Sequence, residues 1–314
     1  MTDGVPTTGK SRGGAGEPRI ALRPALNEAV ETLRAAGVHS PRADAEQLAA
    51  HLLGIERGRL MLVPMVEPEL LAAFRALIDQ RARRIPLQHL TGLAAMGEID
   101  LAVGPGVFVP RPETELLFAW ALAHLETLPH DHAPVVVDLC TGSGALALAV
   151  AHARPDAEVH AVELDPEALK WARRNADDRI EAGDTAITLH AADVTDSALL
   201  AELIGRVDVV LSNPPYIPAG AELEPEVSHH DPHLALFSGA DGLDVIRAMV
   251  PTIARLLRPG GATAIEHDDT NGSSLAALLM NRGEFDEVVE HPDLAGKPRF
   301  VTARRTRADG RASA

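Results

Sequence analysis

The tetrapeptide Asn213-Pro214-Pro215-Tyr216 combines an amide, two prolines and the only tyrosine of a chain of 314 residues. It follows the apolar run at residues 207–212, which predicts a buried strand. Adjacent prolines fix φ and remove two backbone donors, so the loop is rigid and its carbonyls are free to accept hydrogen bonds. We expect the Asn213 oxygen and the Pro214 carbonyl to hold a planar NH2 group beneath the Tyr216 ring. A simple turn that closes a strand explains the same four residues equally well.

A glycine-rich segment follows another expected strand, at residues 135–139, and opens an expected helix. Its glycines let the backbone turn tightly and approach a ligand without a Cβ clash. The candidate cofactor-binding residues of this segment are Asp138, Cys140, Thr141, Gly142, Ser143 and Gly144. Glu163 ends the next expected strand, where a carboxylate can accept hydrogen bonds from both hydroxyls of a ribose. Asp193 ends the third and is placed to meet an adenine, although a helix N-cap explains it equally well.

The glycine segment is compatible with two kinds of cofactor. Gly142, Gly144 and Ala147 fit the fingerprint of dinucleotide-binding proteins, whose third position accepts alanine. Asp138 argues against NAD, because its carboxylate would repel a pyrophosphate but attract an ammonium or a sulfonium. The segment therefore favours S-adenosylmethionine over a dinucleotide, and a purely structural turn is the third interpretation.

Two different patterns position these residues along the chain. Residues 19–85 show helical periodicity, with Leu22, Leu26 and Leu33 on one face, and predict a small helical bundle domain. Residues 86–115 are expected to form a connector in which 99–103 and 107–109 pair as a β-hairpin.

Strands alternate with helices from residue 116 to residue 305. This alternation predicts an α/β fold, with a doubly wound, mostly parallel, seven-stranded sheet that ends in an antiparallel pair. The segments at 1–18 and 306–314 are expected to be disordered tails.

Composition narrows the class of protein. The net charge of −16 makes non-specific nucleic-acid binding unfavourable, because neutralisation of phosphates supplies most of that affinity. One cysteine, Cys140, excludes an intramolecular disulfide and fits a reducing cytoplasm. No apolar run approaches 18 residues, so no membrane span is expected.

One cluster of candidate metal ligands occurs in the chain, at residues 229–233, and contains three histidines and an aspartate. Adjacent side chains rarely converge on one ion, and the segment lies in an expected loop. We therefore expect no metal site and interpret the cluster as a solvated loop near the tetrapeptide.

The motifs together resemble the release-factor glutamine N5-methyltransferase family, which belongs to the class I S-adenosylmethionine-dependent methyltransferases. The resemblance runs from about Arg19 to Arg305. Its segments are Pro86-Leu87, Gly92, Val109-Pro110-Arg111-Pro112-Glu113-Thr114-Glu115, Asp138 to Gly144, Asn213 to Pro218, Asp241 to Asp244, Pro259-Gly260-Gly261 and Asp293 to Gly296. The tetrapeptide alone also resembles adenine amino-methyltransferases, and the segment at 109–115 is the more specific discriminator.

The resemblance implies methyl transfer to the side-chain amide of the glutamine in the Gly-Gly-Gln motif of peptide chain release factors. It assigns residues 140–144 to the amino-acid portion of S-adenosylmethionine, Glu163 to the ribose and residues 213–216 to the glutamine amide. Val194 falls where the family has an aromatic residue that stacks on adenine. The helical domain is expected to dock the protein substrate, and the enzyme is expected to be a cytoplasmic monomer. The alternatives are an adenine N6-methyltransferase that acts on nucleic acid and an NAD-binding oxidoreductase.

Overall fold

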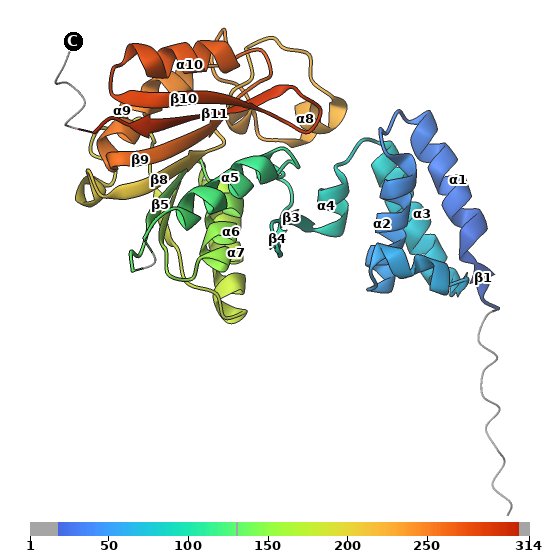
Figure 1. The fold of residues 1–314 in the computed structure, drawn as a ribbon. Helices are drawn as coiled ribbons and strands as arrows, with labels where there is room; N and C mark the ends of the chain where they lie inside the picture. Colours follow the sequence, from blue (N-terminus) through green and yellow to red (C-terminus); the bar gives the residue numbers. More distant parts are fainter. Residues whose placement is uncertain (1–17, 130, 308–314) are drawn as a thin grey trace, which may run out of the picture. The chain divides into compact units, whose positions relative to one another are not determined.

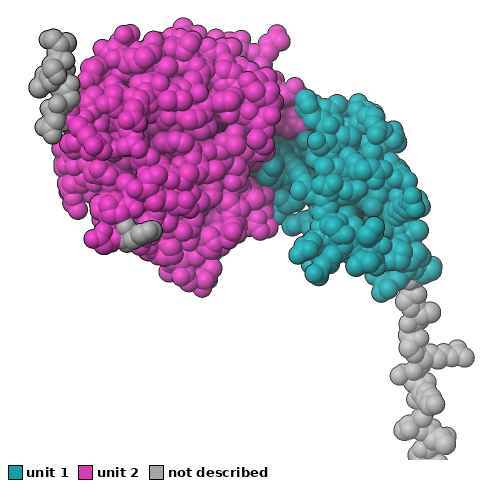
Figure 2. Space-filling model, in the orientation of Figure 1, with its two compact units in different colours: residues 1–91 teal, residues 92–314 magenta. Residues whose placement is uncertain are grey.

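The computed structural model describes residues 18–129 and 131–307 of the chain. Of the two expected tails, only residues 18, 306 and 307 are among them, so both predictions lie almost entirely outside the described residues. The chain divides into two compact units, residues 1–91 and 92–314, which Figure 2 colours separately. Within the described ranges, no helix combines the length and the hydrophobicity that crossing a membrane requires.

The first unit is helical. Its elements are α1 (Leu22–Ala35), α2 (Pro41–Leu53), the 3-10 helix η1 (Arg57–Leu62), α3 (Pro68–Ala82) and α4 (Leu87–Thr91). Proline stands at the start of α2 and α3, where its missing N–H costs no hydrogen bond. Leu33, Leu48 and Phe74, one from each long helix, are fully buried in the core. The sequence did not predict the two-residue strands β1 (Ile20–Ala21) and β2 (Met65–Val66), which pair antiparallel beside this core.

The expected β-hairpin is present, but its strands differ from those predicted. It joins β3 (Leu93–Met96) to β4 (Ile99–Ala102), whereas residues 107–109 form no strand. Gly97 has a φ of +58° in the two-residue turn, a conformation that suits glycine and the twist of a tight hairpin. Val107 and Val109 are instead buried in a small apolar cluster against Trp171. Their hydrophobicity therefore reflects core packing and not strand pairing.

The second unit is built on a seven-stranded sheet of order β10-β11-β9-β8-β5-β6-β7. Its strands are β5 (Val135–Leu139), β6 (Glu158–Glu163), β7 (Thr188–Ala191), β8 (Val207–Ser212), β9 (Leu257–Glu266), β10 (Phe285–Pro292) and β11 (Pro298–Arg305). The strands from β9 to β7 run parallel, and β11 and β10 add an antiparallel edge. The predicted doubly wound, mostly parallel α/β sheet is confirmed.

Helices cover both faces of this sheet (Figure 1). They are α5 (Thr114–Glu126), α6 (Ala145–Ala153), α7 (Pro166–Glu181), α9 (Asp244–Leu256) and α10 (Gly272–Asn281), and the shorter segments are η2 (Ala201–Leu203), α8 (Pro225–His230) and η3 (His233–Ala235). Successive side chains of β5 point to opposite faces of the sheet. Val137 packs in the cluster with α9 and α10, and Val136 packs in the cluster with α5 and α6. Both faces of the central strands are thus buried, which explains their continuous apolar runs.

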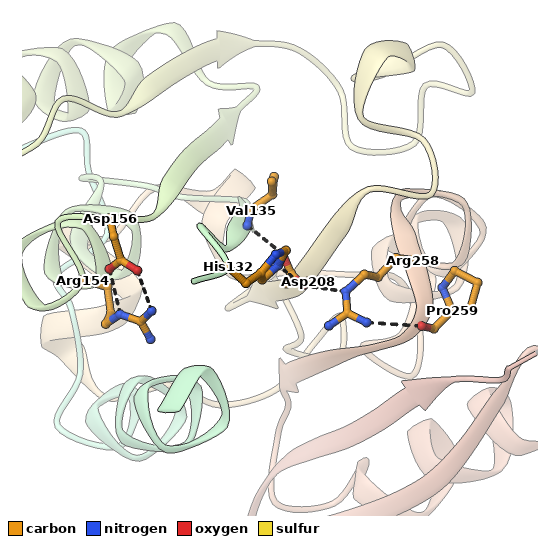
Figure 3. A network of polar contacts seen from close by, with 7 residues as sticks. All are labelled: His132, Val135, Arg154, Asp156, Asp208, Arg258 and Pro259. Atoms are coloured by element: carbon orange, nitrogen blue, oxygen red, sulfur yellow. Dashed lines mark hydrogen bonds and ion pairs between the residues drawn. The ribbon is translucent and has the colours of Figure 1, made fainter. Parts of the chain in front are cut away.

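A buried carboxylate ties together the amino-terminal ends of the central strands (Figure 3). The Asp208 side chain is fully buried at the start of β8 and accepts hydrogen bonds from the Val135 backbone N–H at 2.9 Å and from Arg258 Nε at 2.6 Å. His132 Nε2 lies 2.9 Å from both of its oxygens. These contacts join β5, β8, β9 and the loop before β5 at the edge of the sheet opposite to the one where β5, β6, β8 and β9 end.

Candidate active site

Four parallel strands bring polar groups to one edge of the sheet. Strand β5 ends one residue after Asp138, β6 ends at Glu163, β8 ends one residue before Asn213 and β9 ends at Glu266. Because carboxyl ends of parallel strands share an edge, residues far apart in the sequence meet there. A pocket of about 260 Å³ opens at this edge, within the second unit.

Most of the predicted site residues line this pocket: Asp138, Cys140, Thr141, Gly142, Ser143, Glu163, Asp193, Val194, Asn213, Pro215 and Tyr216. Gly144 and Pro214 do not. Gly144 precedes α6 with a φ of +86°, and a Cβ on it would stand 3.0 Å from Leu148 Cδ1. Pro214 is buried. Gly144 therefore serves the close packing of the turn, and Pro214 could reach a ligand only through its backbone.

The turn after β5 leaves open space for a ligand beside Gly142. Cys140 and Gly142 have φ values of +63° and +59°, a conformation that costs a cysteine more than a glycine. No atom lies within 4 Å of a Cβ built on Gly142, so the pocket is open beside it. The Gly142 N–H donates to Glu163 Oε2 at 2.8 Å, which links this turn to the end of β6. The segment thus leaves room for a cofactor close to its backbone, while the N–H groups of Thr141, Gly142 and Gly144 donate within the protein.

Asp138 is the most deeply buried carboxylate of the pocket. Its Oδ2 accepts a hydrogen bond from the Thr141 hydroxyl at 2.5 Å, whereas its Oδ1 is buried without a well-formed hydrogen bond. Burial raises the pKa of Asp138 to about 7, and the Thr141 hydroxyl and the Ala147 backbone N–H act against that shift. The Ser143 Oγ, in the same turn, is likewise buried without a partner among the described residues. Buried polar atoms of this kind need a partner, and a ligand ammonium group fits both.

Glu163 and Asp193 already take part in local hydrogen bonds. Besides Gly142, the Asp165 N–H donates to Glu163, at Oε1 and 2.8 Å. Each carboxylate oxygen has two lone pairs, so both can still accept a second hydrogen bond from a ligand hydroxyl. Asp193 Oδ1 accepts from the N–H and the hydroxyl of Thr195, at 2.8 and 2.7 Å. Asp193 therefore stabilises its own turn while it lines the pocket.

The Asn213 amide is held through Thr114 and Glu266, neither of which was predicted as a site residue; Thr114 also lines the pocket. Asn213 Nδ2 donates to Thr114 Oγ1 at 3.1 Å, and Thr114 Oγ1 donates to Glu266 Oε2 at 2.8 Å. The Tyr216 hydroxyl donates to the other Glu266 oxygen at 3.0 Å. Glu266 resembles Glu163 in one respect that the sequence shows: it is an acidic residue at the end of a buried apolar strand. The same pattern that predicted Glu163 as a site residue could therefore have predicted Glu266.

An ion pair joins two segments beside the pocket. Arg111 pairs with Asp231 and lies 5.0 Å from the centre of the Phe108 ring. Phe108, Pro232 and Leu234, which are near this pair in the sequence, line the pocket. The histidine cluster at 229–233 therefore includes a structural carboxylate, and across the described ranges no group of side chains is arranged to hold a metal ion.

The sheet order, the glycine turn after β5 and the acidic end of β6 define an S-adenosylmethionine-dependent methyltransferase. In agreement, the family described as methyltransferase small domain matches residues 117–230, and the family described as PrmC N-terminal domain matches residues 24–92. The chain belongs to the release factor glutamine methyltransferase family. The protein of that name from Mycolicibacterium smegmatis is 57% identical to it, over 90% of this chain and 98% of its own length.

A second relative supports the same assignment. The release factor glutamine methyltransferase of Mycobacterium tuberculosis H37Rv is 52% identical over 91% of this chain and 92% of its own length. A solved structure of a release-factor-specific protein-(glutamine-N5) methyltransferase from Alicyclobacillus acidocaldarius is 26% identical, with a TM-score of 0.38, over 65% of this chain and 98% of its own. The predicted class, family and methyl donor are confirmed, and neither the adenine nor the NAD alternative is favoured.

Proposed function

We propose that this enzyme transfers the methyl group of S-adenosylmethionine to the side-chain amide nitrogen of the glutamine in the Gly-Gly-Gln motif of peptide chain release factors. The observation that carries the proposal is the Asn213 amide at the pocket. Its NH2 group is engaged by Thr114, and none of the described residues donates to its oxygen. An unengaged acceptor at the end of a rigid Pro-Pro loop suits the NH2 group of a substrate amide.

The chemistry asks the protein to activate a poor nucleophile. An amide nitrogen shares its lone pair with the carbonyl, and it gains positive charge as it forms the new bond. Asn213 Oδ1 and the Pro214 carbonyl accept its two hydrogens and stabilise that charge from fixed positions. Tyr216 packs against the amide plane and limits its rotation, which keeps the nitrogen close to the methyl group. S-adenosylmethionine, when bound, supplies that methyl on a cationic sulfur. After attack, the nitrogen releases one proton to water.

The remaining candidate residues hold the cofactor. Asp138 and the turn at 140–144 bind its amino-acid portion, and the buried Asp138 Oδ1 and Ser143 Oγ support that role. Glu163 accepts the ribose hydroxyls with its free lone pairs. Asp193 and Val194 border the adenine, where a valine gives apolar contact without aromatic stacking.

The enzyme is proposed to act as a cytoplasmic monomer whose helical domain, residues 19–85, docks the protein substrate, with residues 86–115 as its connector to the catalytic domain at 116–305. It is proposed to bind no nucleic acid directly. The net charge of −16 supports this, because a polyanion would be repelled. Light scattering of the purified enzyme tests the monomer, and retention on a DNA or RNA column tests the last point.

Methyl transfer to a purified release factor tests the proposed function. The enzyme is incubated with methyl-labelled S-adenosylmethionine and release factor, and the peptides are mapped by mass spectrometry. We expect a gain of one methyl group, about 14 Da, on the Gly-Gly-Gln peptide, and no label on a release factor in which that glutamine is replaced by alanine. Label on any other residue, or on nucleic acid alone, contradicts the proposal.

A further inference from the structure

Three hydrogen bonds form one continuous chain next to the loop at residues 213–216, which we call the acceptor loop. They run from Asn213 through Thr114 to Glu266 and return from Glu266 to Tyr216, with lengths of 3.1, 2.8 and 3.0 Å. Thr114 begins α5 and Glu266 ends β9, and both are almost completely buried, with 3% and 1% of their surface exposed. Glu266 is not among the residues that line the pocket.

The direction of this chain is determined by how many hydrogens each group has. An ionised carboxylate has none, so Glu266 can only accept, and the Thr114 hydroxyl must give it its single hydrogen. Thr114 can then only accept from its other neighbour. Asn213 must therefore turn its NH2 group toward Thr114, which leaves its oxygen for the pocket. A side-chain amide has two orientations of nearly the same shape, and hydrogen bonds decide between them.

We propose that Glu266, acting through Thr114, is a positioning residue that selects the amide orientation in which Asn213 presents its oxygen to the substrate. The inference rests on the proposed function, because only a substrate with NH2 hydrogens requires an acceptor at this point. The same carboxylate also receives the Tyr216 hydroxyl hydrogen, so one buried group positions both sides of the substrate amide. Neither Glu266 nor Thr114 exchanges a proton with the substrate.

The alternative orientation would oppose the reaction. With the amide reversed, Asn213 would present two hydrogens to the NH2 group of the substrate, and donor would face donor. A protonated carboxyl group or an amide at position 266 permits this, since either can donate to Thr114 and free the Thr114 hydrogen for Asn213 Oδ1. Burial raises the pKa of Glu266 to about 7, with the Thr114 and Tyr216 hydrogen bonds and Arg299 acting against that shift and Glu113 adding to it. Assays at pH 8 therefore favour the ionised carboxylate.

Three substitutions test the inference in the full-length enzyme at pH 8. Thr114→Val removes the hydroxyl at nearly constant volume, Thr114→Ser keeps it, and Glu266→Gln replaces the carboxylate with an amide that donates. We expect Thr114→Val and Glu266→Gln to lower kcat for release-factor methylation by about 10- to 100-fold. The Kd for S-adenosylmethionine, measured by calorimetry, should change by less than about 3-fold. Thr114→Ser should keep kcat within about 3-fold of the wild type. Thr252→Val, in a buried threonine of α9, is the matched control.

A double variant separates relay from independent packing. Thr114 and Glu266 act on Asn213 through one path. The double variant, Thr114→Val with Glu266→Gln, should therefore have a kcat no lower than that of the less active single variant. The inference would be overturned if the loss of kcat in the double variant equals the product of the two single losses. It would also be overturned if Thr114→Ser is as slow as Thr114→Val. A folded Thr114→Val enzyme with wild-type kcat would overturn it too, and this variant decides the matter if Glu266→Gln does not fold. Failure of the proposed function looks different: the wild-type enzyme itself then labels no release factor, and this inference falls with it.

Discussion

Gly242 lies directly against the carbonyl group of Tyr216, so closely that a Cβ on Gly242 would overlap the Tyr216 oxygen. The same Cβ would stand 2.7 Å from Asn271 Nδ2, which donates to that oxygen at 3.2 Å. Gly242 also has a φ of +78°, where residues with a Cβ are strained. The segment after the acceptor loop therefore folds back on Tyr216, and only glycine fits at the contact.

Gly242→Ala should displace Tyr216 and lower both stability and turnover. We expect a loss of roughly 2 to 4 kcal/mol in the free energy of unfolding, because backbone overlap adds to the conformational strain. Denaturant unfolding and methylation assays measure the two effects. Gly220→Ala is the control, since Gly220 has a φ of +88° but no atom within 4 Å of an added Cβ. Equal losses in both variants would mean that strain alone, and not the contact with Tyr216, is responsible.

Asn213→Ala should reduce turnover while it leaves the cofactor in place. We expect kcat to fall by at least about 100-fold, the cost of removing one preorganised partner of the transition state. Calorimetry should give a Kd for S-adenosylmethionine within about 3-fold of the wild type. The exposed Asn281 at the end of α10 provides the control, and Asn281→Ala should be fully active. Parallel losses of turnover and cofactor affinity would refute the assignment of Asn213 to the acceptor.

Asp138→Asn should weaken cofactor binding by about 10- to 100-fold, because a charge-assisted hydrogen bond is replaced by a neutral one. Calorimetry at pH 8 measures this. Glu222→Gln, in an exposed acid, is the control. An unchanged Kd in Asp138→Asn would exclude Asp138 from the cofactor site.

The same variant should be more stable than the wild type at pH 8 without cofactor. The folded state of the wild type holds the Asp138 proton up to about pH 7, whereas the unfolded chain loses it near pH 4. The wild type therefore loses stability as the pH rises from about 4 to about 7, and the variant lacks this loss. We expect a gain of roughly 1 to 3 kcal/mol at pH 8 and a smaller one at pH 5, measured by urea unfolding. The prediction is wrong if the difference in free energy of unfolding between Asp138→Asn and the wild type is less favourable to the variant at pH 8 than at pH 5.

Asp208→Asn should destabilise the second unit, although Asp208 lies at the edge of the sheet opposite to the pocket. Burial alone would raise the pKa of Asp208, but the Val135 N–H, Arg258 and His132 outweigh it and hold the pKa below its usual range. The carboxylate thus contributes stability above about pH 4 that is lost as the pH falls through its folded pKa. We expect a loss of about 2 to 4 kcal/mol at pH 7, shrinking toward pH 3.

The pair of Arg154 and Asp156, drawn in the same view, is the control for this prediction (Figure 3). Asp156 is half exposed, so Asp156→Asn should cost less than about 1 kcal/mol. Urea unfolding at several pH values compares the two variants. Equal costs would mean that burial of Asp208 adds nothing to its ion pairs.

Local sequence determined the chemistry that this chain carries. The apolar runs predicted β5 at residues 135–139 and β8 from residue 207, and the helix expected after the glycine turn is α6. These elements follow from patterns a few residues long. The prolines of the acceptor loop and the glycines of the turn fix their own backbone, so their placement at strand ends could be inferred without any long-range contact.

Only the tertiary structure decided how the acceptor is oriented. Thr114 and Asn213 are 99 residues apart, and Thr114 and Glu266 are 152 apart, yet each pair shares a hydrogen bond. No local periodicity encodes such a pairing, because it arises where a helix start and two strand ends meet at one edge of the sheet. The hairpin shows the same limit, since Val107 and Val109 are apolar for packing against Trp171 and not for pairing with a strand. The sequence by itself specified the reactive groups. The folded sheet brought hydrogen-bonding neighbours to them, and these neighbours set the orientation of the Asn213 amide.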